Sequence, residues 1–229
     1  MLLAERYRSV LERVEASCRA AGRPESDVEL VVVTKNHPAD LVAELYDLGH
    51  RHFGENRDQE AGPKAKELAD GGRRDASWHF VGQLQSNKVR TVLNYAASIH
   101  SIDRPSLLKE LRKQLSNRSL EIHGFIELNL TDDPGRGGVE PDNLIELAEQ
   151  VLEIPQIRLM GVMAVAGLGV DPRVDFEKTL AASEQLKGVV PSADKLSMGM
   201  SEDFELAIEM GATHIRVGSA ITGPRPNYA

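Results

Sequence analysis

Short apolar runs alternate with amphipathic segments along almost the whole chain, and this alternation limits the possible folds more than any other feature. Every apolar run but the last is followed by a segment with helical periodicity, which indicates parallel strands joined by right-handed crossovers. The runs predict eight strands, at residues 30–35, 52–56, 78–83, 98–103, 122–130, 159–164, 195–198 and 214–217. Eight such units predict an α/β fold, a closed (β/α)8 TIM barrel.

Two further features complete the predicted architecture. Residues 2–22 have the periodicity of an amphipathic helix that ends at Gly22, so we expect an extra N-terminal helix before the barrel. No linker or shift in composition divides the chain, which predicts a single domain over residues 1–229. An open doubly wound sheet is the alternative, but the chain has no Gly-rich dinucleotide-binding turn.

Charge and composition exclude several classes of function. The net charge of -8 argues against nucleic acid or an anionic membrane as the main partner. Cys18 is the only cysteine, so an internal disulfide is impossible. The N-terminus is charged and has no long apolar core, and no stretch approaches the length of a membrane span. We therefore expect a cytoplasmic protein. A monomer is also expected.

Lys35 is the first candidate functional residue. It ends the β-branched run at residues 29–35, and such runs are typical of strands buried on both faces of a parallel sheet. Barrel enzymes keep their chemistry at the carboxyl ends of the strands, so an amine there is a candidate Schiff-base nucleophile. The alternative is a lysine that only marks the exit of the strand into solvent.

Polar residues end most of the other predicted strands as well, and in a closed barrel these ends converge on one mouth. A purely structural barrel would not require that repetition. The residues at the ends of the later strands are Asn56, Gln83, Asp103, Asn129, Met163, Ser197 and Arg216.

The turn after the last strand is a candidate phosphate site. Backbone N–H groups at Gly218 and Ser219, with the Ser219 hydroxyl, could bind an anion, and Ser197 at the end of strand seven supplies another hydroxyl. Strand eight neighbours strand one in a closed barrel, so a phosphorylated aldehyde could contact this turn and Lys35 together. Pyridoxal 5'-phosphate (PLP) has that chemistry. An ordinary strand-to-helix turn is the alternative.

Arg216 lies two residues before Gly218 and therefore on the same face of its strand. A guanidinium keeps its proton, so opposite a pyridine nitrogen it would leave that nitrogen unprotonated and make the ring a weaker electron sink. That arrangement would disfavour transamination. The alternative is an ion pair with a helix carboxylate such as Glu209.

Six motifs together resemble those of the PLP homeostasis proteins (the YggS/PROSC family). They are residues 33–35, 53–56, 78–88, 100–104, 196–201 and 216–221. The resemblance covers nearly the whole chain. It implies a barrel like the N-terminal domain of bacterial alanine racemase, which is a fold type III PLP protein.

The resemblance also implies the roles of individual residues. PLP would be a covalent aldimine on Lys35, with Arg216 facing the pyridine nitrogen and Asn56 beside the ring. Ser197, Gly218 and Ser219 would hold the phosphate, and Met198 and Met163 would pack near the cofactor. Arg136, in the polar loop at 131–140, stands where lysine-bearing versions occur, so a second lysine contact is not expected there.

The function that the resemblance implies is PLP binding for intracellular vitamin B6 homeostasis, without robust catalytic activity. PLP-dependent apo-enzymes are candidate partners. The alternative is an amino-acid racemase, which needs a second base. In racemases a second β domain supplies it, and this chain leaves no room for one. The tyrosines, Tyr7, Tyr46, Tyr95 and Tyr228, lie on predicted helices or in the tail.

A metal-dependent hydrolase is a third hypothesis. His50 and His52 could place two imidazoles on one strand face, but both lie toward its amino end, away from the mouth. The other histidines show no ligand spacing, so we expect no metal. Trp78 and His79 begin strand three, and we expect them to pack at the base of the barrel.

Overall fold

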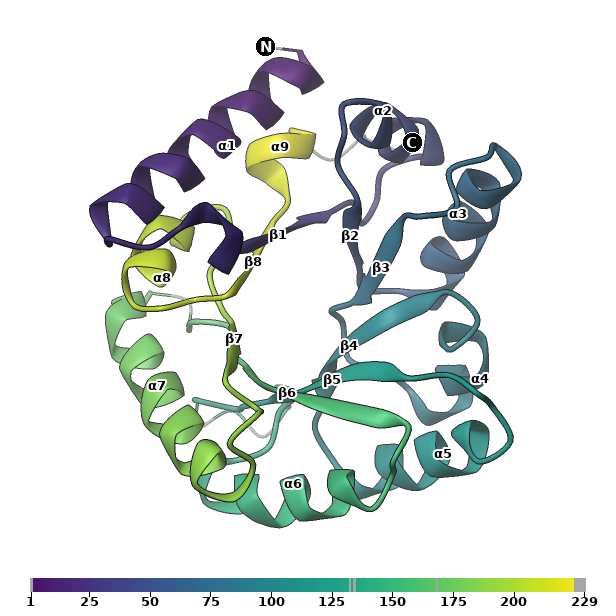
Figure 1. Cartoon of the computed structure of the whole chain (residues 1–229), viewed down its shortest axis with the longest axis vertical. Coiled ribbons are helices and arrows are strands. Elements are labelled where there is room, and N and C mark those ends of the chain that lie inside the picture. Colours follow the sequence, from purple (N-terminus) through teal and green to yellow (C-terminus); the bar gives the residue numbers. More distant parts are fainter. Residues whose placement is uncertain (1, 132, 134, 168, 225–229) are drawn as a thin grey trace.

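The computed structural model describes residues 2–131, 133, 135–167 and 169–224, and its strands form one closed barrel (Figure 1). All neighbouring strands are parallel, and they follow each other around the barrel in sequence order. They are β1 (Glu29–Val33), β2 (His52–Glu55), β3 (Ser77–Phe80), β4 (Ala96–Ile102), β5 (Ile122–Glu127), β6 (Ile157–Met163), β7 (Lys195–Ser197) and β8 (His214–Val217). The predicted TIM barrel is confirmed.

The ring closes between the first and last strands. Residues Glu29 to Val32 of β1 pair in register with residues His214 to Val217 of β8. This pairing brings the end of β1 next to the end of β8, as the closed topology predicts. Residues near the two ends of the sequence therefore lie side by side in the barrel.

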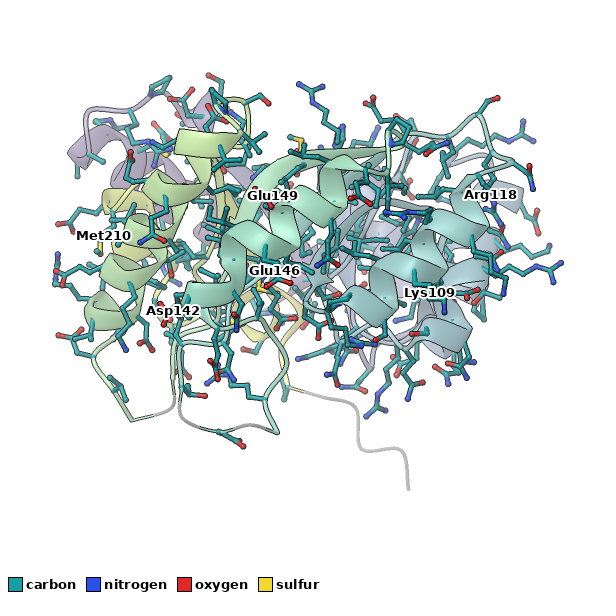
Figure 2. All side chains as sticks on the ribbon, turned by 90° about the horizontal axis from the view of Figure 1, so that it is seen from below. Lys109, Arg118, Asp142, Glu146, Glu149 and Met210 are labelled. Atoms are coloured by element: carbon teal, nitrogen blue, oxygen red, sulfur yellow. The ribbon has the colours of Figure 1, made fainter. Side chains whose placement is uncertain are left out.

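Helices form an outer ring around the strands (Figure 1). After α1 (Leu3–Ala20) come α2 (Ala39–Asp47), α3 (Asp58–Asp70), α4 (Val89–Val92), α5 (Pro105–Leu115), α6 (Leu144–Leu152), α7 (Pro172–Val189), α8 (Phe204–Glu209) and α9 (Ser219–Thr222). Helices α5 and α6 each bury one apolar stripe, because apolar residues recur three and four residues apart. In α6, for example, Leu144, Leu147 and Val151 are buried, while Glu146 and Glu149 lie on the outer face (Figure 2).

The N-terminal helix α1 (Leu3–Ala20) completes this outer ring. The helix after β8, α9, has a single turn, so it cannot cover the last sector of the barrel alone. Helix α1 packs against both α8 and α9. Arg6 also donates hydrogen bonds from Nε to the carbonyl of Ile221 at 2.7 Å and from Nη2 to the carbonyl of Thr222 at 3.2 Å. The predicted extra helix therefore holds the segment that follows β8.

The predicted element boundaries differ from the observed ones in three informative places. Strand β1 ends at Val33, so Lys35 lies on the turn that follows it. Strand β5 ends at Glu127 rather than at residue 130, because the chain turns back and Leu128 bridges to Val139. The helical segment predicted after the third strand is a 3-10 turn (Ser86–Lys88) followed by the single turn of α4. In each case pairing and packing with distant residues sets the boundary.

Among the residues described, no helix has both the length and the apolar character needed to cross a bilayer.

Candidate functional site

Lys35 lies two residues beyond the end of β1, on a turn that is held on both sides. The preceding Thr34 is completely buried, and its hydroxyl donates to Glu55 Oε1 at 2.8 Å. The following Asn36 has a φ of 63° and donates its backbone N–H to Glu60 Oε2 at 2.8 Å. The Lys35 side chain is partly exposed at the mouth, on a backbone that its neighbours fix.

Lys64 is the principal support of this turn, and sequence reasoning did not identify it. Its ammonium is buried and donates to Glu55 Oε1 at 2.6 Å and to the Thr34 carbonyl at 3.0 Å. Burial raises the pKa of Glu55, and the charge and hydrogen bond of Lys64 oppose that rise. A lysine on a charged helix gives no sign that it points inward. Lys64 thereby fixes the peptide carbonyl directly before Lys35.

The end of β8 lies against the end of β1. A Cβ added at Gly218 would lie 3.4 Å from the carbonyl oxygen of Val33, so the two backbones are in contact. The backbone N–H groups of Gly218 and Ala220 point to the hydroxyl of Ser201, at 3.2 and 3.4 Å. Ser219 is exposed between them. Ser201, from the loop after β7, is the hydroxyl that organises this turn.

Arg216 is buried in the interior of the barrel below the mouth. Its guanidinium donates to Ser197 Oγ at 2.6 Å and to the Ala164 carbonyl at 2.8 Å. Burial lowers the pKa of Arg216 to about 10, while the charges of Glu127 and Asp203 oppose that fall, so the group stays protonated at neutral pH.

Ser197 lies beside Arg216, whereas Glu209, the alternative partner considered from the sequence, does not. Ser197 Oγ also contacts His100 Nδ1 at 2.8 Å, so this hydroxyl lies inside the barrel rather than in the Gly218 turn. Its contact with a phosphate stays a prediction. The alternative partner for Arg216, Glu209, instead lies 3.7 Å from Arg173 on the outside of the barrel.

Glu127 is a further titratable group at the mouth that sequence reasoning missed. Burial and the nearby charge of Asp103 raise its pKa to about 7, against the opposing charges of Arg216, Arg136 and Arg104. Its Oε2 atom is buried and has no hydrogen-bond partner in the described part of the chain. The strand was expected to end at 130, which assigned the mouth position to Asn129 instead.

Asn56 lies at the mouth, directly after β2. Its Oδ1 atom is buried, and no donor among the described residues reaches it. A hollow of about 260 Å³ opens beside it, lined in part by Phe80 and Gln83. A larger pocket of about 590 Å³ lies on the outer side of the barrel between α3 and α4 and contains none of the predicted site residues.

The remaining residues predicted for the site either hold a loop or are buried in the core. Asn129 holds the 131–140 loop, because its Oδ1 accepts from the Thr131 N–H at 3.0 Å and its Nδ2 donates to the Asp133 carbonyl at 3.0 Å. Met198 is fully buried in the hydrophobic core, and Met163 is buried at the end of β6. Contacts of the two methionines with a cofactor stay predictions.

The hydroxyl groups of the described tyrosines all have side-chain partners. The Tyr7 hydroxyl lies 3.1 Å from His50 Nδ1, and the Tyr95 hydroxyl donates to Asp58 Oδ1 at 3.4 Å. Tyr46 donates to Asp75. Tyr228 lies outside the described residues.

The mouth thus combines an accessible amine, a permanently charged guanidinium and a turn of backbone N–H groups. Such a set suits an anionic ligand that carries a carbonyl group. The buried acceptors at Asn56 and Glu127 lack donors within the described structure, and a bound polar ligand could supply them.

Comparison with known proteins identifies relatives over nearly the full length. The family model for the alanine racemase N-terminal domain matches residues 10–226. A pyridoxal phosphate homeostasis protein of Aquifex aeolicus is 38% identical over 229 residues, covering 98% of this chain and 99% of the relative. PipY of Synechococcus elongatus, solved with PLP bound, superposes with a TM-score of 0.84 at 34% identity, covering 97% of this chain and 100% of PipY.

A more distant likeness concerns the fold alone. Alanine racemase from Corynebacterium glutamicum superposes with a TM-score of 0.65 at 16% identity. The match covers 95% of this chain but 61% of the racemase.

Proposed function

Because this chain belongs to the family of pyridoxal phosphate homeostasis proteins, we propose that it binds PLP at the mouth of its barrel through Lys35. The observation that carries the proposal is the contact between the ends of β1 and β8. It places the Lys35 turn beside the Gly218–Ser219 turn, with Arg216 buried below. An amine and a turn that would bind an anion then lie side by side in one small site.

Each group of the site has a distinct task toward PLP. Lys35 would hold the aldehyde carbon covalently through its amine. The turn at Gly218 and Ser219 would hold the phosphate, with Ser201 ordering its N–H groups. Asn56 would lie beside the ring, where its buried oxygen lacks a donor among the described residues. When bound, PLP supplies a reactive aldehyde and a ring that can accept electrons.

Arg216 favours a carrier over a transaminase. It stays protonated at neutral pH, and Ser197 and Ala164 fix its orientation. A guanidinium facing the pyridine nitrogen cannot accept a proton, so the nitrogen would stay unprotonated and the ring would draw electrons weakly. Each described tyrosine hydroxyl is engaged by another side chain, which disfavours its use as a second base for racemisation.

We therefore propose that the protein binds PLP for homeostasis of the cofactor, without robust catalysis. Its role would lie in the cytoplasm, and PLP-dependent apo-enzymes are the partners we expect. The name of the Aquifex relative and the PLP in the PipY structure support this assignment.

The test is borohydride reduction of the purified protein with PLP, followed by peptide mapping. We expect one pyridoxyl group per chain, on the peptide that contains Lys35. The matched control is Lys88→Ala, which removes another partly buried lysine near the mouth. Lys35→Ala should lose the modification completely and keep its melting temperature, whereas Lys88→Ala should retain the modification. Labelling spread over surface lysines, or full labelling in Lys35→Ala, would contradict the proposal.

A further inference from the structure

A second polar cluster lies at the opposite end of the barrel, where the strands begin. Glu29 is the first residue of β1, His52 is the first residue of β2, and His79 lies in β3. Each offers one ligand atom to a compact group, and these atoms all lie within 4.8 Å of one another. The proposed PLP site uses none of these residues.

The separations between the facing atoms are specific. His52 Nδ1 lies 3.2 Å from Glu29 Oε2 and 3.1 Å from His79 Nε2. His79 Nε2 lies 3.5 Å from Glu29 Oε1. Zinc binds nitrogen and oxygen at about 2.0–2.1 Å in tetrahedral sites, which puts neighbouring ligand atoms about 3.3 Å apart. These separations are close to that spacing, although the carboxylate faces His52 through Oε2 and His79 through Oε1. One oxygen of Glu29 lies within 4.8 Å of both ring nitrogens.

One of the facing atoms lacks the partner that burial normally demands. Glu29 Oε1 is buried without a hydrogen-bond partner within the described residues. Its neighbours are His79 Nε2 and His214 Nε2, the latter at 3.4 Å. A cation between the carboxylate and the imidazoles would satisfy this oxygen.

His100 orients His79, the most deeply buried of the three proposed ligands. The other nitrogen of His79, Nδ1, lies 3.0 Å from His100 Nε2, and His100 Nδ1 lies 2.8 Å from Ser197 Oγ. Metal-bound histidines characteristically use the second ring nitrogen in this way, which fixes the tautomer and leaves the first nitrogen for the ion. Phe125 stacks on His100, with ring centroids 4.4 Å apart, and restrains the imidazole further.

The cluster is also reachable from solvent. The side chains of His52 and Glu29 are 37% and 30% exposed, whereas that of His79 is 5% exposed. An ion could therefore enter from the base of the barrel and reach the buried nitrogen without passing the mouth.

Against the expectation from the sequence, we propose that Glu29, His52 and His79 form a binding site for a divalent transition-metal ion of the zinc class at the amino-terminal end of the barrel. Two imidazoles and one carboxylate make three protein ligands and leave a fourth position for water or for His214. Mixed nitrogen and oxygen ligands select zinc or cobalt over magnesium and calcium, which prefer oxygen alone.

The experiment is a titration of tag-free, chelator-dialysed protein with Co²⁺, read by its visible absorption bands, followed by competition with Zn²⁺. We expect one ion per chain and displacement of Co²⁺ by stoichiometric Zn²⁺. Glu29→Gln and His52→Asn each remove a partly exposed ligand, so both variants should fold. Each should weaken binding about tenfold or more.

His123→Asn is the matched control. His123 is a partly exposed histidine at the same end of the barrel, 4.0 Å from Glu121 and outside the cluster. It should bind Co²⁺ within about twofold of the unchanged protein. Absence of saturable Co²⁺ binding would overturn the proposal and leave the cluster as a hydrogen-bonded histidine network. Equal affinity in Glu29→Gln, His52→Asn and the unchanged protein would overturn it as well. Neither result depends on PLP.

Discussion

The two ends of the barrel are both lined by polar side chains, but the groups that hold these side chains in place differ between the two ends. At the mouth the key groups sit on turns after the strands, and backbone atoms or ion pairs hold them, as Lys64 holds the Lys35 turn. At the base the key groups lie within the strands and contact one another, as His52, His79 and His100 do in succession.

This difference follows from where each side chain is attached. Residues on turns have backbone groups without strand partners, which can bind a ligand as well as protein atoms. Residues inside the barrel have their backbone groups in the sheet, so only the side chains are available. The mouth therefore suits a multi-atom ligand such as a phosphorylated aldehyde, and the base suits a single ion.

The largest effect that we expect at the mouth concerns the buried pair of Lys64 and Glu55. Lys64→Met leaves the buried Glu55 carboxylate without its cation, which should lower the free energy of unfolding by about 3–5 kcal/mol. Urea denaturation measures this loss.

Two matched variants sharpen this test. Lys66→Met, on the exposed face of the same helix, should change stability by less than about 0.5 kcal/mol. The double variant Glu55→Met/Lys64→Met should recover much of the loss, because it removes both charges. A loss below about 1 kcal/mol in Lys64→Met would show that this pair does not support the turn.

Glu127 should make the mouth sensitive to alkaline pH. Its pKa is raised from 4.5 to about 7 in the folded protein, so folding favours the protonated acid. That stabilisation is complete below about pH 4.5 and is lost as the pH rises through 7, a difference of about 3 kcal/mol. Glu127→Gln cannot ionise, so in PLP-free protein it should be the more stable form at about pH 8.

Denaturation at a series of pH values measures the effect of Glu127. Glu121→Gln removes an exposed carboxylate near the start of the same strand and should leave the pH profile unchanged. If Glu127→Gln has the same pH profile as the unchanged protein, the carboxyl group is not desolvated at the mouth.

The smallest effect concerns the base. Phe125 stacks on His100 at 24° between ring planes and meets the edge of His214 at a centroid distance of 4.9 Å. Phe125→Leu keeps most of the buried volume but loses these ring contacts, so it should cost about 1–2 kcal/mol. Thermal denaturation measures the change, and trapping of PLP on Lys35 should be unaffected.

Phe176 provides the control for the base. It is as buried as Phe125, but the described part of the chain contains no ring pair with it. Phe176→Leu should therefore cost less than Phe125→Leu. A large loss of PLP trapping in Phe125→Leu would show that the base and the mouth of the barrel do not act independently.

Much of the architecture could be predicted because it depends on local patterns. Alternating apolar runs and amphipathic segments determine strands, helices and their order, and eight repeats close one ring. The same logic put Lys35 and Gly218 at one edge, which the register of β1 and β8 confirms. Boundaries were less accurate, as at β5, because pairing with distant residues decides where a strand ends.

The sequence by itself therefore determined the barrel, the position of Lys35 next to the last strand, and a row of polar residues around the mouth. Only the tertiary structure decided that Lys64 points inward. It also decided that Glu127, rather than Asn129, ends strand β5 at the mouth, and that Glu29 lies against His52 and His79. The physical reason is the distance along the chain between the residues that interact. Hydrogen-bond periodicity acts over a few residues and leaves a pattern in the sequence, whereas contacts inside a barrel join residues whose spacing along the chain is arbitrary.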